Sequence, residues 1–315
     1  MPFFKPLGAL AALLLAASGA HAQQAWPAKP IRLVIPQAVS GGADLVARLM
    51  APEIEKRLGQ PFVIDNRPGG NDTIGPDIVA KAPPDGYTIG VISSSHSLNQ
   101  TTAGIKTPYD PQKDLIPIAP MVRVPMVVVV GTQLGVNDLK SLVALSKAQP
   151  GKLNYASAGP ATFGGMATEW MVRLGKADIT HITYGGRGIF QGLMAGDVHM
   201  ALGGVAATAP TVQTGKIKII AVSSAQRIAK LPDVPTVSET FPGYDVVPFY
   251  GFVAPAGTPP EIVARLNTAI GETIAALSPR LIDMGNEPMR MTQAEFRAYL
   301  ARDLVTWQKI VEAVK

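Results

Sequence analysis

Residues 31–58 read IRLVIPQAVSGGADLVARLMAPEIEKRL, and this stretch decides the fold class. Ile31 to Ile35 is an unbroken apolar run, which is typical of a buried strand. From Asp44 to Leu58, apolar residues recur at four-residue steps, and this spacing predicts an amphipathic helix. The small residues between the two, 36–42, predict a tight strand-to-helix loop.

Strands and helices continue to alternate along the chain. A β-α-β-α-β order favours a mostly parallel sheet covered by helices. A terminal amphipathic helix is predicted at 294–314. Further strands are predicted at 62–64, 87–92, 127–130, 153–156, 179–183, 199–202, 217–223 and 249–254, and further helices at 74–82, 138–148 with Asn137 as its cap, 164–174, 187–195, 206–214 and 260–277.

The length of 315 residues suggests about two domains. We expect an α/β protein of two lobes, each a mostly parallel sheet flanked by helices, with a ligand cleft between them. Residues 23–124 and 223–315 are predicted to form the first lobe, and residues 125–222 the second.

The N-terminus has the pattern of an export signal. Lys5 precedes an uncharged run, and Ala20-His21-Ala22 is the small-x-small pattern that signal peptidases cut. We therefore expect residues 1–22 to be a cleaved signal peptide. The uncharged run is too short to span about 30 Å of hydrocarbon.

Composition excludes several classes of function. The chain has no cysteine, which rules out a disulfide framework, a zinc-thiolate site and a cysteine nucleophile. A net charge of +5 without a Lys/Arg tract makes nucleic-acid binding unexpected. His96, His181 and His199 lack metal-ligand spacing, so no metal or cofactor is predicted.

Enzyme signatures are also weak. Phosphate-binding and dinucleotide-binding glycine motifs do not occur. Tyr155-Ala156-Ser157-Ala158-Gly159 approaches a nucleophile elbow but lacks its first glycine. A serine hydrolase that uses Ser157 remains an alternative.

Two small-residue loops, 36–42 and 157–162, each follow a strand and precede a helix. A helix N-terminus presents unpaired N–H groups and partial positive charge, so such loops suit anions. Residues 93–96 form a third loop of this kind. One loop in each lobe could grip a carboxylate from opposite sides, although α/β folds also use small residues at these turns for structural reasons alone.

Short motifs in order along the chain resemble one family, the Bug-type receptors, which are the periplasmic solute-binding proteins of tripartite tricarboxylate transporters. The resemblance covers essentially the whole chain after residue 25. The motifs are WPAKPIR (26–32), DNRPGG (65–70), DGYT (85–88), PYDPQKD (108–114), PGKLNYASAG (150–159), HITYGG (181–186), LPDVPT (231–236) and APAGTP (254–259).

The resemblance implies a monomeric periplasmic protein of the type II binding-protein class that closes around a small organic mono- or dicarboxylate. It also implies two membrane permease subunits as partners. A sensory receptor that reports the same ligand to a membrane signalling partner is the alternative, and the sequence does not separate the two.

The chain departs from the family pattern in both loops. Gln37, Val39 and Ser40 replace the usual residues of the first loop. Ala161 and Gly165 replace a Gly and a His of the second. A frequent family Asp is Gly203 here, which disfavours ligands that carry an amino group.

The residues that we expect to contact the ligand are small, carry a hydroxyl or amide donor, or lie beside these loops. Arg187 suits a second carboxylate through its bidentate fork. Asp44 is expected to fix its loop by accepting backbone N–H bonds. The candidates are Gln37, Ala38, Val39, Ser40, Gly41, Ser94, Ser95 and Phe249 in the first lobe, and Ser157, Ala158, Gly159, Ala161, Thr162, Tyr184, Arg187 and Gly203 in the second.

Overall fold

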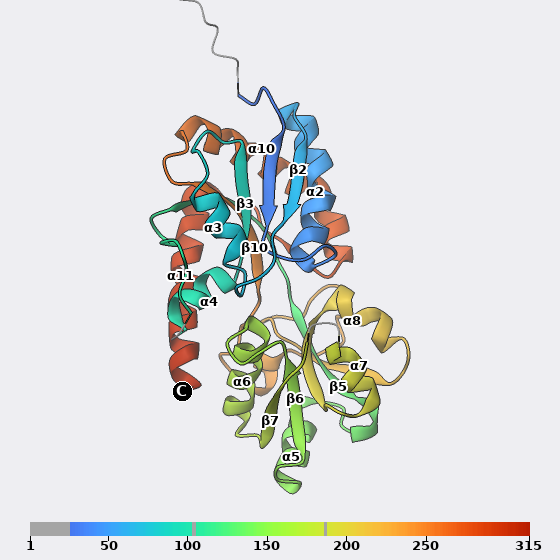
Figure 1. The fold of residues 1–315 in the computed structure, drawn as a ribbon. Helices are drawn as coiled ribbons and strands as arrows, with labels where there is room; N and C mark the ends of the chain where they lie inside the picture. The colour runs from blue at the N-terminus through green and yellow to red at the C-terminus, as the bar shows by residue number, and fades with distance from the viewer. Residues whose placement is uncertain (1–25, 103–104, 186–187) are drawn as a thin grey trace, which may run out of the picture.

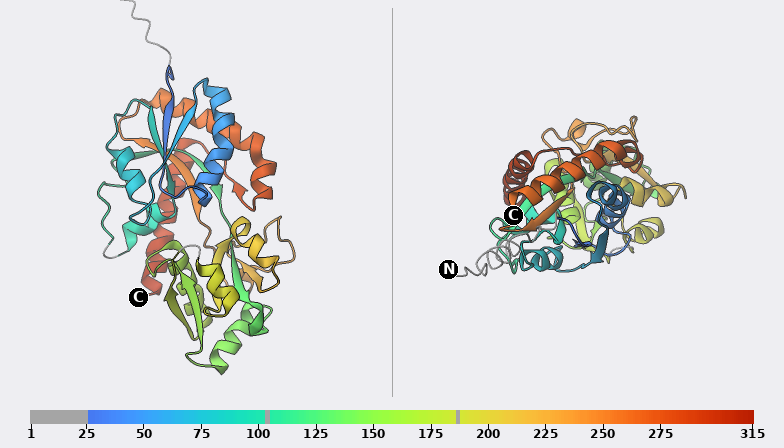
Figure 2. Two further views of the ribbon diagram at one scale, coloured as in Figure 1. Left: turned by 45° about the vertical axis from the view of Figure 1, so that its right-hand side comes forward. Right: turned by 90° about the horizontal axis from the view of Figure 1, so that it is seen from above.

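The computed structural model describes residues 26–102, 105–185 and 188–315. The predicted signal peptide, 1–22, and Arg187 lie outside these ranges. The chain forms two lobes joined end to end (Figure 1, Figure 2). Within the described ranges, no helix is long and apolar enough to cross a membrane.

The first lobe is built on a six-stranded sheet of order β11-β4-β10-β3-β1-β2. Its strands are β1 (Ile31–Ile35), β2 (Phe62–Asn66), β3 (Thr88–Ser93), β4 (Leu115–Arg123), β10 (Phe249–Pro255) and β11 (Glu287–Pro288). Its helices are α2 (Gly42–Leu58), α3 (Ile74–Ala80), α4 (Ser95–Thr101), α10 (Pro260–Asp283) and α11 (Gln293–Ala313).

The second lobe is built on a five-stranded sheet of order β7-β6-β8-β5-β9. Its strands are β5 (Met126–Gly131), β6 (Leu153–Ser157), β7 (Ile179–Thr183), β8 (Met200–Gly204) and β9 (Ile217–Val222). Its helices are α5 (Leu139–Ala148), α6 (Phe163–Gly175), α7 (Gly188–Ala195), α8 (Val205–Val212) and the short α9 (Val237–Thr240), with a 3-10 turn η1 (Thr132–Leu134).

Both sheets contain parallel and antiparallel strand pairs. The antiparallel pairs arise at the strand with which the chain enters each lobe from the other lobe. β1 pairs in parallel with β2 and β3, and β6 does so with β7 and β8, as the sequence pattern predicts. β5 and β10 follow crossovers between the lobes and run antiparallel to both of their neighbours. The carboxyl ends of the parallel strands in both sheets therefore face the boundary between the lobes (Figure 1).

Helix α11 connects the two lobes along one side of the molecule (Figure 1). Phe296, near its start, is fully buried against Phe249 of the first sheet. Trp307 and Ile310, near its end, pack in the hydrophobic core of the second lobe. The helix thus crosses the lobe boundary along one side of the molecule, as Figure 1 shows.

Three local predictions differ from the structure. The predicted loop 93–96 is shorter than expected, because Ser95 and His96 already belong to α4, a helix that the sequence did not predict. The cap of α5 is Asp138, whose carboxylate accepts from the Ser141 amide at 2.7 Å, so the prediction of Asn137 is wrong. An aspartate one position later satisfies the helix amides better because it completes a capping box. Strand β4 was missed because Pro117 and Pro120 interrupt its apolar run. Both prolines lie beside register shifts against β10, where a missing N–H is tolerated.

Candidate ligand-binding site

The first loop is held in place by Asp44. Gly41 is the N-cap of α2, and Ser40 has a left-handed backbone with φ of 66°. The Ser40 amide donates to Asp44 Oδ2 at 2.9 Å, which confirms the expected role of this carboxylate. Burial alone would raise the pKa of Asp44, but hydrogen bonds from Arg48, Ser40 and Asn66 hold it below its usual value.

Gln37 lies against the start of α2. Its Oε1 accepts from the Ala43 amide at 2.9 Å, so the side chain satisfies one of the helix N-terminal donors. Residues 38–40 form the exposed tip of the loop. The backbone and small side chains of the tip are therefore the part of the first loop that a ligand can reach.

Asp72 lies where three loops of the first lobe meet, and the sequence analysis did not single it out. Its Oδ2 accepts from the Ser93 hydroxyl at 2.7 Å, and the side chains of Gln37 and Ser95 lie beside it. Burial raises the pKa of this carboxyl. Asn71 and Asp72 have φ of 53° and 65°. Asn and Asp are the residues other than glycine that best tolerate this conformation, and their position after the glycine pair is the signal that could have found them.

Ser94 and Phe249 serve the core of the first lobe. The Ser94 hydroxyl accepts from the Phe249 amide at 2.9 Å, and both residues are buried. The Phe249 ring packs edge-on against Phe296 and Tyr299, with ring centres 6.1 and 5.2 Å away. We therefore leave these two residues out of the ligand site. Ser95 stays beside it through Asp72.

The second loop is shaped by its own hydroxyls. Ser157 Oγ accepts from the Gly159 amide at 3.1 Å. Thr162 is the N-cap of α6, accepting from the Gly165 amide at 3.2 Å and donating to the Gly159 carbonyl at 2.7 Å. Both hydroxyls thus fix the backbone of residues 157–162 at the start of a helix.

Ser157 also contacts His181, a pairing that sequence reasoning did not predict. Its Oγ lies 2.7 Å from His181 Nε2. Burial lowers the pKa of His181 despite the nearby Glu169 carboxylate, so the ring is neutral near pH 7. Glu169 instead accepts from the Tyr155 hydroxyl at 2.9 Å and pairs with Arg173. This arrangement fits a clamp on the second loop better than an activated nucleophile.

The loops of the two lobes meet at one boundary. Asn71 Nδ2 of the first lobe donates to the Ala161 carbonyl of the second loop at 3.2 Å. Ser40 and Gly42 line a cavity of about 210 Å³ together with residues 204–207 at the start of α8. Both predicted loops therefore open toward the opposite lobe.

Tyr184 and Gly203 lie deeper in the second lobe. The Tyr184 amide donates to the Ser157 carbonyl at 2.8 Å, and its ring covers Gly192 of α7. A Cβ atom at Gly203 would lie 2.4 Å from Thr208 Cγ2 and 2.6 Å from Phe190 Cζ. Neighbouring side chains thus fill the space that an aspartate at position 203 would need.

We expect Gly203→Asp to destabilise the protein by about 2 kcal/mol, because it overpacks the end of β8 and buries a carboxylate. Chemical denaturation measures the loss. Gly204→Ala is the matched control, since a Cβ there has no atom within 4 Å. Equal stability of the Gly203 variant and the control would contradict the packing argument.

Comparisons with known proteins agree with this architecture. The sequence model of the tripartite tricarboxylate transporter family receptor matches residues 46–315. Protein BugT of Bordetella pertussis is 31% identical over 296 residues, covering 91% of this chain and 89% of BugT.

Two solved structures from Rhodopseudomonas palustris, each 30% identical, share the fold. Rpa4515 with adipate has a TM-score of 0.85 and covers 92% of this chain and 98% of its own. MatC with bound malate has a TM-score of 0.79 and covers 91% and 100%. With the family match over most of the sequence, they show that this chain belongs to the receptors of the tripartite tricarboxylate transporter family, the Bug-type periplasmic solute-binding proteins.

Proposed function

We propose that this receptor captures a small organic carboxylate between its lobes and delivers it to the membrane permease subunits of a tripartite transporter. The proposal rests on one observation above all: the loop before α2 and the loop before α6 open on the same lobe boundary. The bound adipate and malate of the two similar structures support a carboxylate as the ligand.

Three helices begin at this boundary, and their N-caps are Gly41, Thr162 and Gly204. Helix N-termini offer N–H donors and partial positive charge to an anion. The exposed tip at residues 38–40 and the backbone of 158–161 are the proposed contacts. Ser157 and Thr162 act by holding the second loop in shape.

Lobe closure would couple binding to transport. A ligand shifts the lobes toward the closed state only by the difference in its affinity for the two states. A carboxylate that is bound to one loop can contact the loop of the other lobe only when the lobes are together. The hydrogen bond from Asn71 to Ala161 joins the two lobes, and we propose that it helps to hold the closed arrangement.

Calorimetry with a panel of mono- and dicarboxylates, adipate and malate included, tests the proposal. We expect at least one acid to bind and to raise the melting temperature in proportion to its concentration. Matched alcohols and amides of the same carbon skeletons should not bind. A complete panel without a binding acid would contradict the proposed function.

Asn71→Gly should weaken carboxylate binding about fivefold, since it removes one hydrogen bond of the closed state. Glycine keeps the left-handed backbone at this position. The variant also removes the bond from Asn71 Nδ2 to Asn99 Oδ1 at 2.7 Å, so the unfolding free energy should fall by about 1 kcal/mol. Titration calorimetry measures the affinity, with Asn137→Gly, at an exposed position away from the boundary, as the control. Unchanged affinity in Asn71→Gly would show that the bond is not part of closure.

The clamp proposed for Arg187 can be tested in the same assay. Arg187→Ala should weaken dicarboxylates and leave monocarboxylates nearly unchanged, because only the former bring a second carboxylate to the guanidinium. Equal losses for both classes would reject this role.

A further inference from the structure

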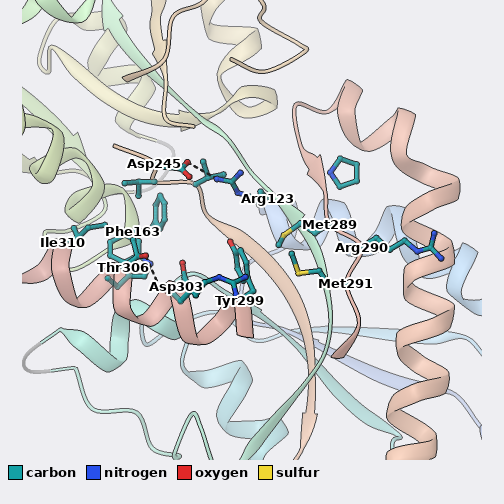
Figure 3. Close-up of a pocket in the computed structure, with 15 residues that line it drawn as sticks. Arg123, Phe163, Asp245, Met289, Arg290, Met291, Tyr299, Asp303, Thr306 and Ile310 are labelled. Carbon is teal, nitrogen blue, oxygen red and sulfur yellow. Dashed lines mark hydrogen bonds and ion pairs between the residues drawn. The ribbon is translucent and has the colours of Figure 1, made fainter. Parts of the chain in front are cut away.

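Two cavities lie where the lobes meet, and they differ in chemistry. The larger, about 670 Å³, borders α11 (Figure 3). Arg123 in its wall is paired with Asp245 at 3.0 Å, and three further charged residues line it: Arg290, Arg302 and Asp303. Because groups of both signs line this cavity, its charge selects no class of ligand. The smaller cavity, about 210 Å³, lies beside the first loop, between the starts of α2 and α8.

The smaller cavity is uncharged. Its lining residues come from both lobes, and none of these described residues carries a charged side chain. Tyr250 is the one titratable group among them, and burial raises its pKa to about 12, so its hydroxyl is neutral near pH 7. The other polar side chains in the wall are Ser40 and Asn286. A charged end of a ligand would lose its hydration here without gaining an ion pair.

Most of the cavity wall is apolar. Leu45 and Val46 of α2 line it from the first lobe, and Val205 and Ala207 of α8 line it from the second. Leu45 is 44% exposed although its side chain is large and apolar, so an apolar ligand group that covers it is favoured. An apolar cavity of about 150 Å³ is large enough to hold benzene. The cavity between α2 and α8 therefore has room for a short alkyl chain or a single ring.

The cavity adjoins the proposed carboxylate contacts. Ser40 belongs both to the exposed tip of the first loop and to the cavity wall. Gly42, the first residue of α2, also lines the cavity, and a Cβ atom there would lie 2.5 Å from the Tyr250 hydroxyl oxygen. Gly204, the N-cap of α8, lines it from the second lobe. A ligand whose carboxylate lies on the loop tip can thus extend its carbon chain directly into the cavity.

Both lobes are needed to form this cavity. Val205 of the second lobe packs against Gly285 of the first, where a Cβ atom would lie 2.7 Å from Val205 Cβ. Val124, on the crossover between β4 and β5, also lines the cavity. An apolar group that fills the space contacts both lobes only while they are together. Filling the cavity therefore favours the closed state.

We propose that the ligand of this receptor is a carboxylate with an apolar body, and that the cavity between α2 and α8 binds that body. This inference rests on the proposed function, since the carboxylate end is taken to lie at the two loops. The far end of the ligand is then an alkyl or aryl group, and a dicarboxylate has to keep its second charge outside this cavity. Leu45, Val205 and Ala207 are the residues that determine this specificity.

Titration calorimetry at pH 7.5 with hexanoate, adipate and propionate tests the inference, with weak acids measured by competition. Hexanoate and adipate share a six-carbon skeleton and differ only at the far end, which is a methyl group in one and a carboxylate in the other. We expect hexanoate to bind at least tenfold more tightly than adipate, because a second carboxylate is not hydrated in the cavity. We expect the same margin over propionate, because hexanoate buries three more carbon atoms.

Ala207→Leu separates the cavity from the loops. The larger side chain occupies the cavity, and because position 207 is exposed, the melting temperature should stay near that of the wild type. We expect this variant to bind hexanoate about tenfold more weakly and propionate as tightly as the wild type does. Ala209→Leu is the matched control, at an exposed position of the same helix that is not among the residues lining the cavity, and it should bind both acids normally.

The outcomes distinguish this inference from the proposed function. If no acid of the wider panel binds, the proposed function itself fails. If acids bind, but hexanoate is no tighter than adipate or propionate, the apolar cavity is rejected as part of the site. The same holds if Ala207→Leu binds hexanoate as the wild type does, and in both cases the carboxylate function stands.

Discussion

Gly165→Ala should abolish most carboxylate binding, with a loss of at least tenfold in affinity, and should destabilise the protein by about 2 kcal/mol. A Cβ atom at this position would lie 2.2 Å from the Gly159 carbonyl oxygen, 2.9 Å from that of Pro160 and 3.0 Å from Ser157 Oγ. Backbone atoms cannot turn away as a flexible side chain can. The second loop must therefore move, and its donors move with it.

Gly164→Ala is the matched control for this variant. The two glycines are neighbours at the start of α6, but a Cβ at Gly164 has no atom within 4 Å. Alanine is favoured over glycine in a helix, so this variant should gain up to about 1 kcal/mol and bind normally. Denaturant unfolding and calorimetry measure both effects. Similar affinities for the two variants would mean that the second loop does not bind the ligand.

The unfolding free energy should fall by about 3 kcal/mol between pH 6.5 and pH 4 because of His96 alone. This ring is buried, and burial lowers its pKa from 6.5 to about 4. The unfolded chain takes up a proton below pH 6.5, whereas the folded chain resists it until about pH 4. The neutral ring therefore makes its full contribution to the unfolding free energy above pH 6.5. This contribution is lost as the pH falls from 6.5 to 4.

His96→Phe isolates the effect, since phenylalanine keeps an aromatic ring beside Tyr109 but cannot be protonated. The raised pKa values of Asp72 and Asp303 act in the opposite direction, and the difference between variant and wild type removes them. The difference in unfolding free energy between the wild type and His96→Phe should change by about 3 kcal/mol from pH 6.5 to pH 4. A constant difference from pH 6.5 to pH 4 would contradict the burial of His96 as the cause.

Periodicity predicted the elements whose apolar faces are continuous. Strand β1 and helix α2 follow from residues 31–58 because Val46, Met50 and Ile54 all face the core of the first lobe. The direction of β5 and β10 could not be predicted in this way. It depends on where the chain crosses between the lobes, which is a long-range property.

The loops of the site were predicted, but the roles of their side chains were not. Small residues after a strand indicate where a helix begins, and this placed 36–42 and 157–162 correctly. Ser157 contacts His181, and Ser93 donates to Asp72; these partners lie 24 and 21 positions apart along the sequence. Only the fold brings such pairs together, and it adds a loop-holding role for the hydroxyls of Ser157 and Thr162.

A crystal structure of the protein with the tightest-binding acid from the panel tests the central claim most directly. We expect one carboxylate of the ligand to lie between residues 38–41 and residues 158–162, with hydrogen bonds from both segments. An acid that contacts only one lobe, or that binds away from both loops, would contradict the account.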